Sequence, residues 1–184
     1  MVKILGEFAW LETLSAARAS PAAGSAAALA GALGVALLIK LARLTPSQDV
    51  PNRDQVLARL LAARDRLTAL AQADAEALSA WVRTRPLPAD DPARQTALRD
   101  MVDVPLEAAE LCQAIAIEAQ PLLGHGHPPA LPDGQVGLQL LAACRRAQCH
   151  LVEANLPALS DADLIESVQT RLEQLNQRKR KELL

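Results

Sequence analysis

Leucine and alanine recur every three or four positions along most of the chain, a spacing that places apolar side chains on one face of an α-helix. No segment shows the two-residue alternation of a half-buried strand. We therefore expect an all-α fold, a bundle of five to seven helices of which two or more are long. The pattern predicts helices over about residues 7–18, 25–44, 52–82 and 135–155, one that starts at Pro92, and a last one after Ser160.

Polar residues and prolines mark where the predicted helices begin and end. Side-chain oxygens at a helix start can accept hydrogen bonds from the free amides of the first turn. Pro105 lies inside a predicted helix, where its ring and missing amide predict a kink or a break near Asp103. The predicted caps are Ser25, Asn52 with Gln55 as a capping box, Asp91 ahead of Pro92, and Ser160 with Asp163 as a capping box.

The composition favours helices over sheets. The 184 residues include 37 Ala and 33 Leu, but only one Phe, two Trp and no Tyr. Ala and Leu favour helices, whereas aromatic and β-branched residues favour strands. A hydrophobic share of 51% with 22% charged residues excludes a disordered chain. We expect a single domain over residues 1–184, and long helices with few aromatic residues favour a homodimer that buries further surface.

Charge and cysteine content point to a cytoplasmic protein. The net charge is −2, so no overall field attracts nucleic acid, and we expect no nucleic-acid partner. The basic run at residues 178–181 suits the negative end of a helix dipole. Glu7 and Glu12 interrupt the stretch where a signal peptide needs an apolar core. The three cysteines are therefore expected to be reduced thiols.

One segment raises the question of a membrane span. Residues 22–39 carry no charge, which meets the minimum length for a spanning helix. However, Ala, Gly and Ser dominate the segment and drive insertion only weakly. The alternative is a central helix buried on all sides, with small residues that let neighbouring backbones come close. We expect this second form and no membrane.

Histidines and cysteines suggest a metal site, but their spacing does not support one. His125 and His127 lie in a predicted loop, while Cys144, Cys149 and His150 lie on a helix. Cys144 and Cys149 are about 140° apart around that helix and do not share a face well. Zinc needs three or four such ligands that converge. We expect no metal and no permanently bound cofactor.

Three carboxylates stand at positions suited to chemistry. Asp74 lies in mid-helix among small residues, Asp103 stands beside Pro105, and Asp133 precedes the predicted helix over 135–155. Each also has a structural interpretation, as a solvated helix face, a local backbone bond or a helix cap. The segment from Pro21 to Ser25 enters a helix and could hold an anion on free amides. These patterns alone name no function.

Several motifs in order resemble the cyclodeaminase/cyclohydrolase family, which includes the C-terminal domain of formiminotransferase-cyclodeaminase and the bacterial methenyltetrahydrofolate cyclohydrolases. Residues 20–37, ending at Leu44-Thr45, resemble its Pro-Gly-Gly-Gly-Ser loop and the Ala/Gly-rich helix that follows. Residues 74–78 resemble its Asp-x-x-Ala-Phe segment, and residues 103–106 its Val-Pro-Leu element. Asp133 and Asn155 match residues at the two ends of the next family helix. The resemblance covers about residues 9–175.

The resemblance implies an all-α folate one-carbon enzyme, either a formimidoyltetrahydrofolate cyclodeaminase or a methenyltetrahydrofolate cyclohydrolase. A tetrahydrofolate derivative would be the substrate. Both reactions need an acid/base and a fixed charge beside the cationic carbon. Asp74 and Asp133 are the implied catalytic residues. The implied substrate-binding residues are Pro21, Gly24, Ser25, Lys40, Arg43 and Asn155.

The chain departs from the family pattern where a folate would be held. Ala22 and Ala23 replace two loop glycines, and Ala resists positive φ and adds Cβ atoms near a ligand. Arg43 and Leu151 replace two family asparagines, and residues 46–52 lack the family's Lys and Tyr. The alternative is therefore a non-catalytic helical dimer that binds a folate-like anion or a protein partner.

Overall fold

The computed structural model describes residues 9–182, with only the backbone described for residue 9 and for residues 177–182. Within this range the chain is helical and has no strand, as the periodicity predicts. Two short 3-10 turns cover Pro128–Ala130 and Leu156–Ala158. The α-helices are α1 (Ala9–Ser15), α2 (Ala23–Leu44), α3 (Arg53–Thr84), α4 (Pro92–Glu118), α5 (Gln120–His125), α6 (Leu131–Asn155) and α7 (Ala162–Glu182).

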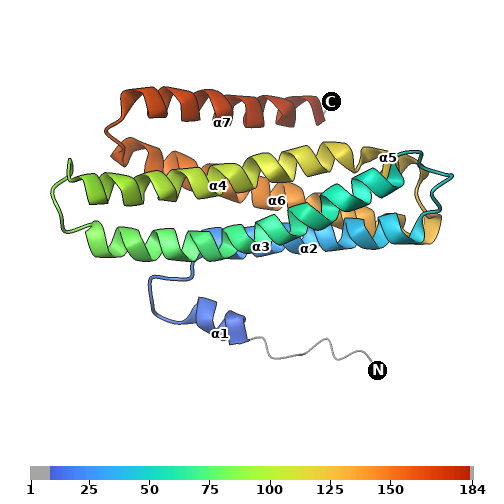
Figure 1. The fold of residues 1–184 in the computed structure, drawn as a ribbon, viewed down its shortest axis with the longest axis horizontal. Helices are drawn as coiled ribbons and strands as arrows, with labels where there is room; N and C mark the ends of the chain where they lie inside the picture. Colours follow the sequence, from blue (N-terminus) through green and yellow to red (C-terminus); the bar gives the residue numbers. More distant parts are fainter. Residues whose placement is uncertain (1–8, 183–184) are drawn as a thin grey trace.

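Four long helices form the central bundle (Figure 1). α2 packs against α3 and α6, and α4 packs against the same two helices from the other side. α7 lies along α4 on one side of this bundle, and the short α1 lies on the opposite side (Figure 1). The predicted bundle of five to seven helices, several of them long, is therefore confirmed.

Glycine allows α2 and α6 to approach closely. A Cβ added at Gly34 would lie 2.7 Å from the carbonyl oxygen of Gly137, and one at Gly137 would lie equally close to the oxygen of Gly34. Gly31 faces α4 and α6, where its absent Cβ would lie 3.0 Å from Cys144 Sγ and 3.2 Å from Cys112 Sγ. Small residues in α2 thus bring neighbouring backbones together, as the sequence predicts.

The expectation that α2 is buried on all sides is only partly correct. By length and composition α2 could cross a membrane, but 56% of its most apolar window is buried in the bundle. Leu33 and Leu44, however, are 60% and 48% exposed. One face of α2 therefore remains open to solvent, because α3 and α6 cover only the other faces.

Buried side chains gather in two clusters along the bundle. The larger cluster joins α2, α3, α4, α5 and α6 and includes Leu38, Leu67 and Leu141. The smaller cluster joins the first half of α4, the end of α6 and α7, and it includes Val102, Val152 and Val168. α7 is thus held by the second cluster, which lies at the end of the bundle where α6 finishes.

Several predicted helix ends are wrong in their details. Only Asp91 acts as predicted, since its carboxylate accepts a hydrogen bond from the Ala93 amide at 2.8 Å. Ser25 lies inside the first turn of α2, because that helix begins two residues earlier. Asn52 precedes α3 but makes no side-chain cap. Asp161, one residue after Ser160, accepts from the Leu164 amide at 3.1 Å and takes the capping role.

Two other expected features of the chain also differ. α4 is continuous through Pro105, so the predicted break is absent, and the alternative of a kink stays a prediction. Pro105 is itself buried, so packing supports the helix at this point despite the missing amide. The region over residues 124–134, expected as a loop, instead contains the end of α5, a 3-10 turn and the start of α6.

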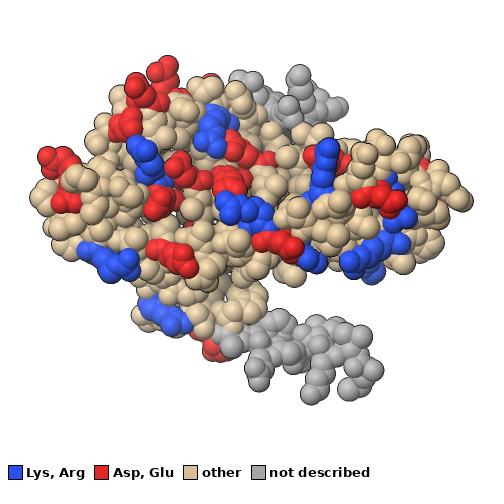
Figure 2. Space-filling view, in the orientation of Figure 1, with Lys and Arg blue, Asp and Glu red and all other residues tan. Residues whose placement is uncertain are grey.

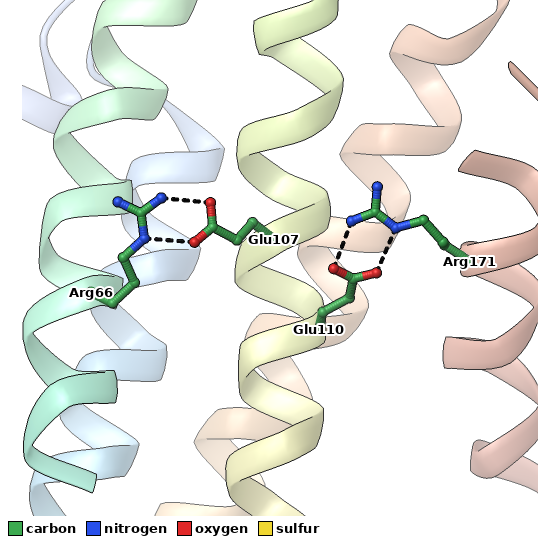
Figure 3. A network of polar contacts seen from close by, with 4 residues as sticks. All are labelled: Arg66, Glu107, Glu110 and Arg171. Carbon is green, nitrogen blue, oxygen red and sulfur yellow. Dashed lines mark hydrogen bonds and ion pairs between the residues drawn. The ribbon is translucent and has the colours of Figure 1, made fainter. Parts of the chain in front are cut away.

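Two bidentate ion pairs connect three helices across the outer face of α4 (Figure 3). Arg66 on α3 contacts Glu107 with both bonds at 2.6 Å. Arg171 on α7 contacts Glu110 with both bonds at 2.7 Å. Because all four side chains are more than a third exposed, these pairs mainly fix how α3 and α7 sit against α4.

On the face viewed in Figure 2, acidic and basic side chains are interspersed. Such mixing is consistent with the net charge of −2. The side chains of the basic run at residues 178–181 lie outside the described residues, so the expectation about that run stays a prediction.

Candidate functional site

A buried carboxylate meets the first turn of α2. Asp74 projects from the middle of α3 and is 8% exposed, and Ser25 is 5% exposed. The Ser25 hydroxyl donates a hydrogen bond of 2.8 Å to Asp74 Oδ2. α2 has no side-chain cap of its own, because Ala22 precedes it. Asp74 therefore supplies, from a neighbouring helix, the negative group that a helix start favours.

Gly24 is required by the position of this carboxylate. A Cβ added at Gly24 would lie 1.9 Å from Asp74 Oδ1 and 2.5 Å from its Cγ. No real side chain fits at that distance, so the carboxylate occupies the space that the missing side chain leaves. The family resemblance predicts that Gly24, Ser25 and Asp74 belong to one site, and the structure brings these three together.

The backbone beside this site tolerates alanine. Ala22 is extended, with φ −140 and ψ −153. Among the described residues no glycine or other residue has a positive φ. The alanines therefore adopt no left-handed backbone in this turn, while the expectation that their Cβ atoms lie near a bound ligand stays a prediction.

Gln148 on α6 also belongs to this site, and sequence analysis missed it. Its side chain is 1% exposed, and its Nε2 donates a 3.0 Å hydrogen bond to the Gly24 carbonyl. A signal was present, because Leu141, Gln148 and Val152 follow a helical spacing on a stripe that is apolar apart from Gln148 and Arg145. A glutamine on such a stripe is a buried polar group that needs a partner.

The surroundings of Asp74 act on its pKa in two opposed ways. Burial raises the pKa of Asp74, while hydrogen bonds from the Ser25 hydroxyl and the Ser25 amide partly offset that rise. A raised pKa brings a carboxyl group closer to the working pH, which improves it as a general acid or base. The site can therefore carry out acid/base chemistry next to the positive end of a helix dipole.

The segment that enters α2 is fastened to α3 near the same carboxylate. The Ser20 hydroxyl donates a 2.8 Å hydrogen bond to the backbone carbonyl of Ala75, the residue after Asp74. Pro21 follows and is half-buried. Pro21, predicted to bind substrate, therefore lies beside the Asp74 site, where it offers its backbone carbonyl but no polar side chain.

Asp133 and Lys40 lie far from Asp74. They form an ion pair of 2.6 Å near the end of α2. Residues 24 and 40 are sixteen positions apart on α2, which at about 1.5 Å per residue is about 24 Å. Arg43 is exposed one turn beyond Lys40. Within one chain, therefore, the two predicted catalytic carboxylates do not meet at one reacting centre.

Asn155 is held by another helix. Its Nδ2 donates a 3.0 Å hydrogen bond to the Met101 carbonyl on α4. It lies seven positions beyond Gln148, about 10 Å further along α6. Its amide thus joins the end of α6 to α4, and this chain alone does not bring Asn155 to the Asp74 carboxylate.

The other candidate reactive groups, Asp103 and the three cysteines, have surroundings that indicate a structural role. Asp103 is half-buried, which raises its pKa, while Arg171 and Arg99 lower it. All three cysteines are free and buried, as expected for reduced thiols. Among residues with described side chains, no three or more His, Cys, Asp or Glu gather as metal ligands would.

Comparisons with known proteins agree on one family. Residues 8–174 match the family model described as Formiminotransferase-cyclodeaminase. Formimidoyltransferase-cyclodeaminase of Rattus norvegicus is 31% identical over 92% of this chain but only 34% of its own length. Methenyltetrahydrofolate cyclohydrolase of Methylorubrum extorquens is 28% identical over 90% of this chain and 86% of its own.

A solved structure shares the fold. The crystal structure of formiminotetrahydrofolate cyclodeaminase from Thermotoga maritima matches with a TM-score of 0.86 and 22% identity. The match covers 96% of this chain and 90% of that chain. The helical bundle is therefore the arrangement of a known protein, and the chain spans about one third of the length of the rat relative.

Proposed function

Because the chain belongs to the formiminotransferase-cyclodeaminase family, we propose that it is a folate one-carbon enzyme. It acts as a formimidoyltetrahydrofolate cyclodeaminase or as a methenyltetrahydrofolate cyclohydrolase, the two activities named among its relatives. The substrate is a tetrahydrofolate derivative, and no permanently bound cofactor takes part. The observation that carries this proposal is the buried Asp74 carboxyl at the start of α2, held by Ser25.

In the deaminase reaction, Asp74 moves one proton. N10 of the substrate attacks the protonated formimino carbon, and a new N10–C bond forms. Asp74 accepts the proton that N10 loses and donates one to the departing nitrogen, so the C–N bond breaks and ammonia leaves. The methenyl bridge keeps the positive charge. The raised pKa of Asp74 suits both halves of this transfer.

In the hydrolase reaction, water attacks the methenyl carbon. Asp74 accepts a proton from this water as the new C–O bond forms. It then donates that proton to one bridge nitrogen as the bond from that nitrogen to the carbon breaks, and the hydroxyl loses its own proton to solvent, which leaves a formyl group. A carboxylate beside the cationic carbon also stabilises its charge. The same residue therefore serves both reactions, and the substrate decides which of them occurs.

We propose that the chain forms a homodimer through the exposed face of α2. This face carries Leu33, and together with Trp10 on α1 and Leu29 it lines an apolar cleft of about 500 Å³. Soluble monomers rarely expose a large contiguous apolar patch. A two-fold contact pairs such a patch with its own copy. In such a dimer, Asp133 and Lys40 of one subunit could lie near the Asp74 site of the other.

Light scattering after size-exclusion chromatography tests this dimer. We expect twice the chain mass for the wild type and the single-chain mass for Leu33→Glu. Val136→Glu, an exposed apolar residue on α6, is the matched control and should leave the mass unchanged. A monomeric wild type at micromolar concentration contradicts the proposal.

We also propose a cytoplasmic location without a nucleic-acid or membrane partner. The free, buried cysteines and the mixed surface charge support it. Fractionation of cells that express the full chain tests the location and the absence of a membrane partner. Recovery in the soluble fraction without detergent is expected, and recovery only with detergent contradicts the proposal.

The first experiment follows the near-ultraviolet absorbance of 5,10-methenyltetrahydrofolate. Wild type should hydrolyse it faster than a protein-free control, or should form it from the 5-formimino substrate with release of ammonia. Asp74→Asn should lose at least about 100-fold of either activity, the usual contribution of a general acid or base. Asp65→Asn, an exposed carboxylate on the same helix, is the matched control and should keep full activity. Full activity in Asp74→Asn refutes its role.

The burial of this site favours a second candidate function. Ser25 and Asp74 are nearly closed to solvent in a single chain. A non-catalytic relative that binds a folate-like anion or a protein partner is compatible with such closure. Absence of turnover with both substrates, together with folate binding by calorimetry, would support it. Restoring Ala22→Gly and Ala23→Gly should then raise folate affinity if only the loop was altered.

A further inference from the structure

We propose that Gln148 is a positioning residue that fixes the first turn of α2 so that Ser25 can bond the Asp74 carboxylate. This inference rests on the proposed function, since it assigns a role in the same site. It also goes beyond it, because Gln148 lies on α6, on the far side of the turn from α3.

Contacts at this turn come from three helices. From α3, the carboxylate of Asp74 fills the space beside Gly24. From α6, the Gln148 amide holds the Gly24 carbonyl at 3.0 Å. From α2, Ser25, the residue after Gly24, bonds Asp74 Oδ2 at 2.8 Å. The Gly24 carbonyl is therefore held by Gln148, and the side chain of the next residue, Ser25, is held by Asp74.

This arrangement couples the two contacts through one rigid group. The Gly24 carbonyl and the Ser25 amide belong to the same planar peptide, so they point in opposite directions. A hydrogen bond that fixes the Gly24 carbonyl therefore also fixes the position from which the Ser25 side chain reaches the carboxylate. Gln148 therefore acts on Asp74 without touching it.

An unpartnered atom argues against packing as the purpose of this glutamine. Gln148 Oε1 is buried and has no hydrogen-bond partner. A buried polar atom left without a partner destabilises the fold, and an apolar residue of similar shape would avoid that penalty. The Gly24 carbonyl lies in the first turn of a helix, where it can also accept the backbone bond from residue 28. Gln148 thus reduces stability locally while it fixes an orientation.

The charges that act on Asp74 are few. Ser25 from α2 is neutral and lowers its pKa through its hydroxyl and amide, and burial raises it. On α6, the titratable groups next to Gln148 are Cys144, Cys149 and the buried Arg145, whose guanidinium bonds the Leu175 carbonyl, and none of the three is among the causes that shift the pKa of Asp74. A change in the pKa of Asp74 on substitution of Gln148 therefore reports mainly on the Ser25 bonds.

The test replaces Gln148 by Met, which has a similar volume and keeps water out. With the peptide no longer fixed, the Ser25 bonds weaken and the pKa of Asp74 rises by about 0.5 to 1 unit. The pKa is read from the carboxyl ¹³C shift against pH, and the Asp74 signal is assigned by its loss in Asp74→Asn. Gln139→Met, at an exposed position on α6, is the matched control and should leave this pKa unchanged.

Turnover and stability supply two more readouts. We expect kcat/KM of Gln148→Met to fall about three- to tenfold near neutral pH, with its pH profile displaced upward. The thermal midpoint should stay unchanged or rise, because the unpartnered oxygen is gone. An unchanged Asp74 pKa, or a lower one, overturns the proposal. An inactive wild type refutes only the proposed function, because the carboxyl shift is measured without substrate.

Discussion

Gly24→Ala is the substitution that tests the contact between Gly24 and Asp74 most sharply. The new Cβ would lie 1.9 Å from Asp74 Oδ1 and 2.5 Å from Cγ, well inside any allowed contact. Either the carboxylate must turn away or the first turn of α2 must move. In both cases the 2.8 Å bond from Ser25 to Asp74 is lost.

The expected loss of stability combines three contributions. A hydrogen bond to a charged group contributes about 1.5–3 kcal/mol. Holding Asp74 away from a preferred rotamer adds about 0.5–1.5 kcal/mol. Against these, alanine favours a helix over glycine by at most about 1 kcal/mol. We therefore expect Gly24→Ala to lower the free energy of unfolding by about 1–3.5 kcal/mol.

Urea unfolding followed by circular dichroism measures this change. Gly124→Ala is the matched control, since a Cβ at Gly124 meets nothing within 4 Å and that residue also lies in a helix. It should be neutral or slightly stabilising. The double variant Gly24→Ala/Asp74→Ala removes the clash, so the alanine at position 24 should cost nothing in that background.

Two results would refute this reasoning. The first is a Gly24→Ala protein as stable as the wild type, which would mean that the carboxylate does not occupy the glycine's side-chain space. The second is an equal loss of stability with and without Asp74. That would place the effect of the alanine in the backbone of α2.

Three further substitutions test other parts of the molecule. Burial raises the pKa of Asp74 above its ordinary value near 3.9, so the stability that protonated Asp74 contributes is full below about pH 4 and is lost as pH rises through the folded pKa. Urea unfolding between pH 4 and 7 should therefore show Asp74→Asn gaining stability relative to the wild type. Gly34→Ala puts a Cβ 2.7 Å from the Gly137 carbonyl and should lower the unfolding free energy by about 1–3 kcal/mol; equal stability to wild type would contradict the close approach. Glu110→Gln breaks the exposed pair with Arg171 and should cost at most about 1 kcal/mol, less in high salt; a larger, salt-independent loss would be unexpected.

Much of the fold was predictable because its signals are local. Apolar spacing located the long helices, and the small residues of α2 predicted close packing that Gly34 and Gly137 realise. The exposure of Leu33 was not predictable, since periodicity does not say how many neighbours cover a helix. The short α5 was missed because prolines and glycines there read as a loop.

Part of the candidate site was also predictable from the sequence, and part was not. Gly24, Ser25 and Asp74 were named from motif order and do meet in the fold. Asp133, named on the same basis, pairs with Lys40 at a distant part of α2. Motif order along a chain does not fix distance in space when the helices are long, because two residues of one motif can lie many turns apart.

The prediction of helix caps was wrong for a related physical reason. Ser25 reads as a local cap, but the group that closes α2 is the Asp74 side chain, forty-nine residues later. Local rules assume that a helix end is satisfied by its own neighbours in sequence. Gln148 was missed likewise, because its partner is the backbone of another helix.

The closure of α2 by another helix has a consequence for the order of folding. A helix with alanine at its cap position has little to define its first turn before α3 and α6 arrive. The first turn therefore forms together with long-range contacts, and it gains its orientation only in the assembled bundle. A partly folded chain can have long stretches of helix and still lack the reactive carboxyl's surroundings. The bundle and the site are then completed in one step, so a substitution that weakens distant packing also disturbs the surroundings of Asp74.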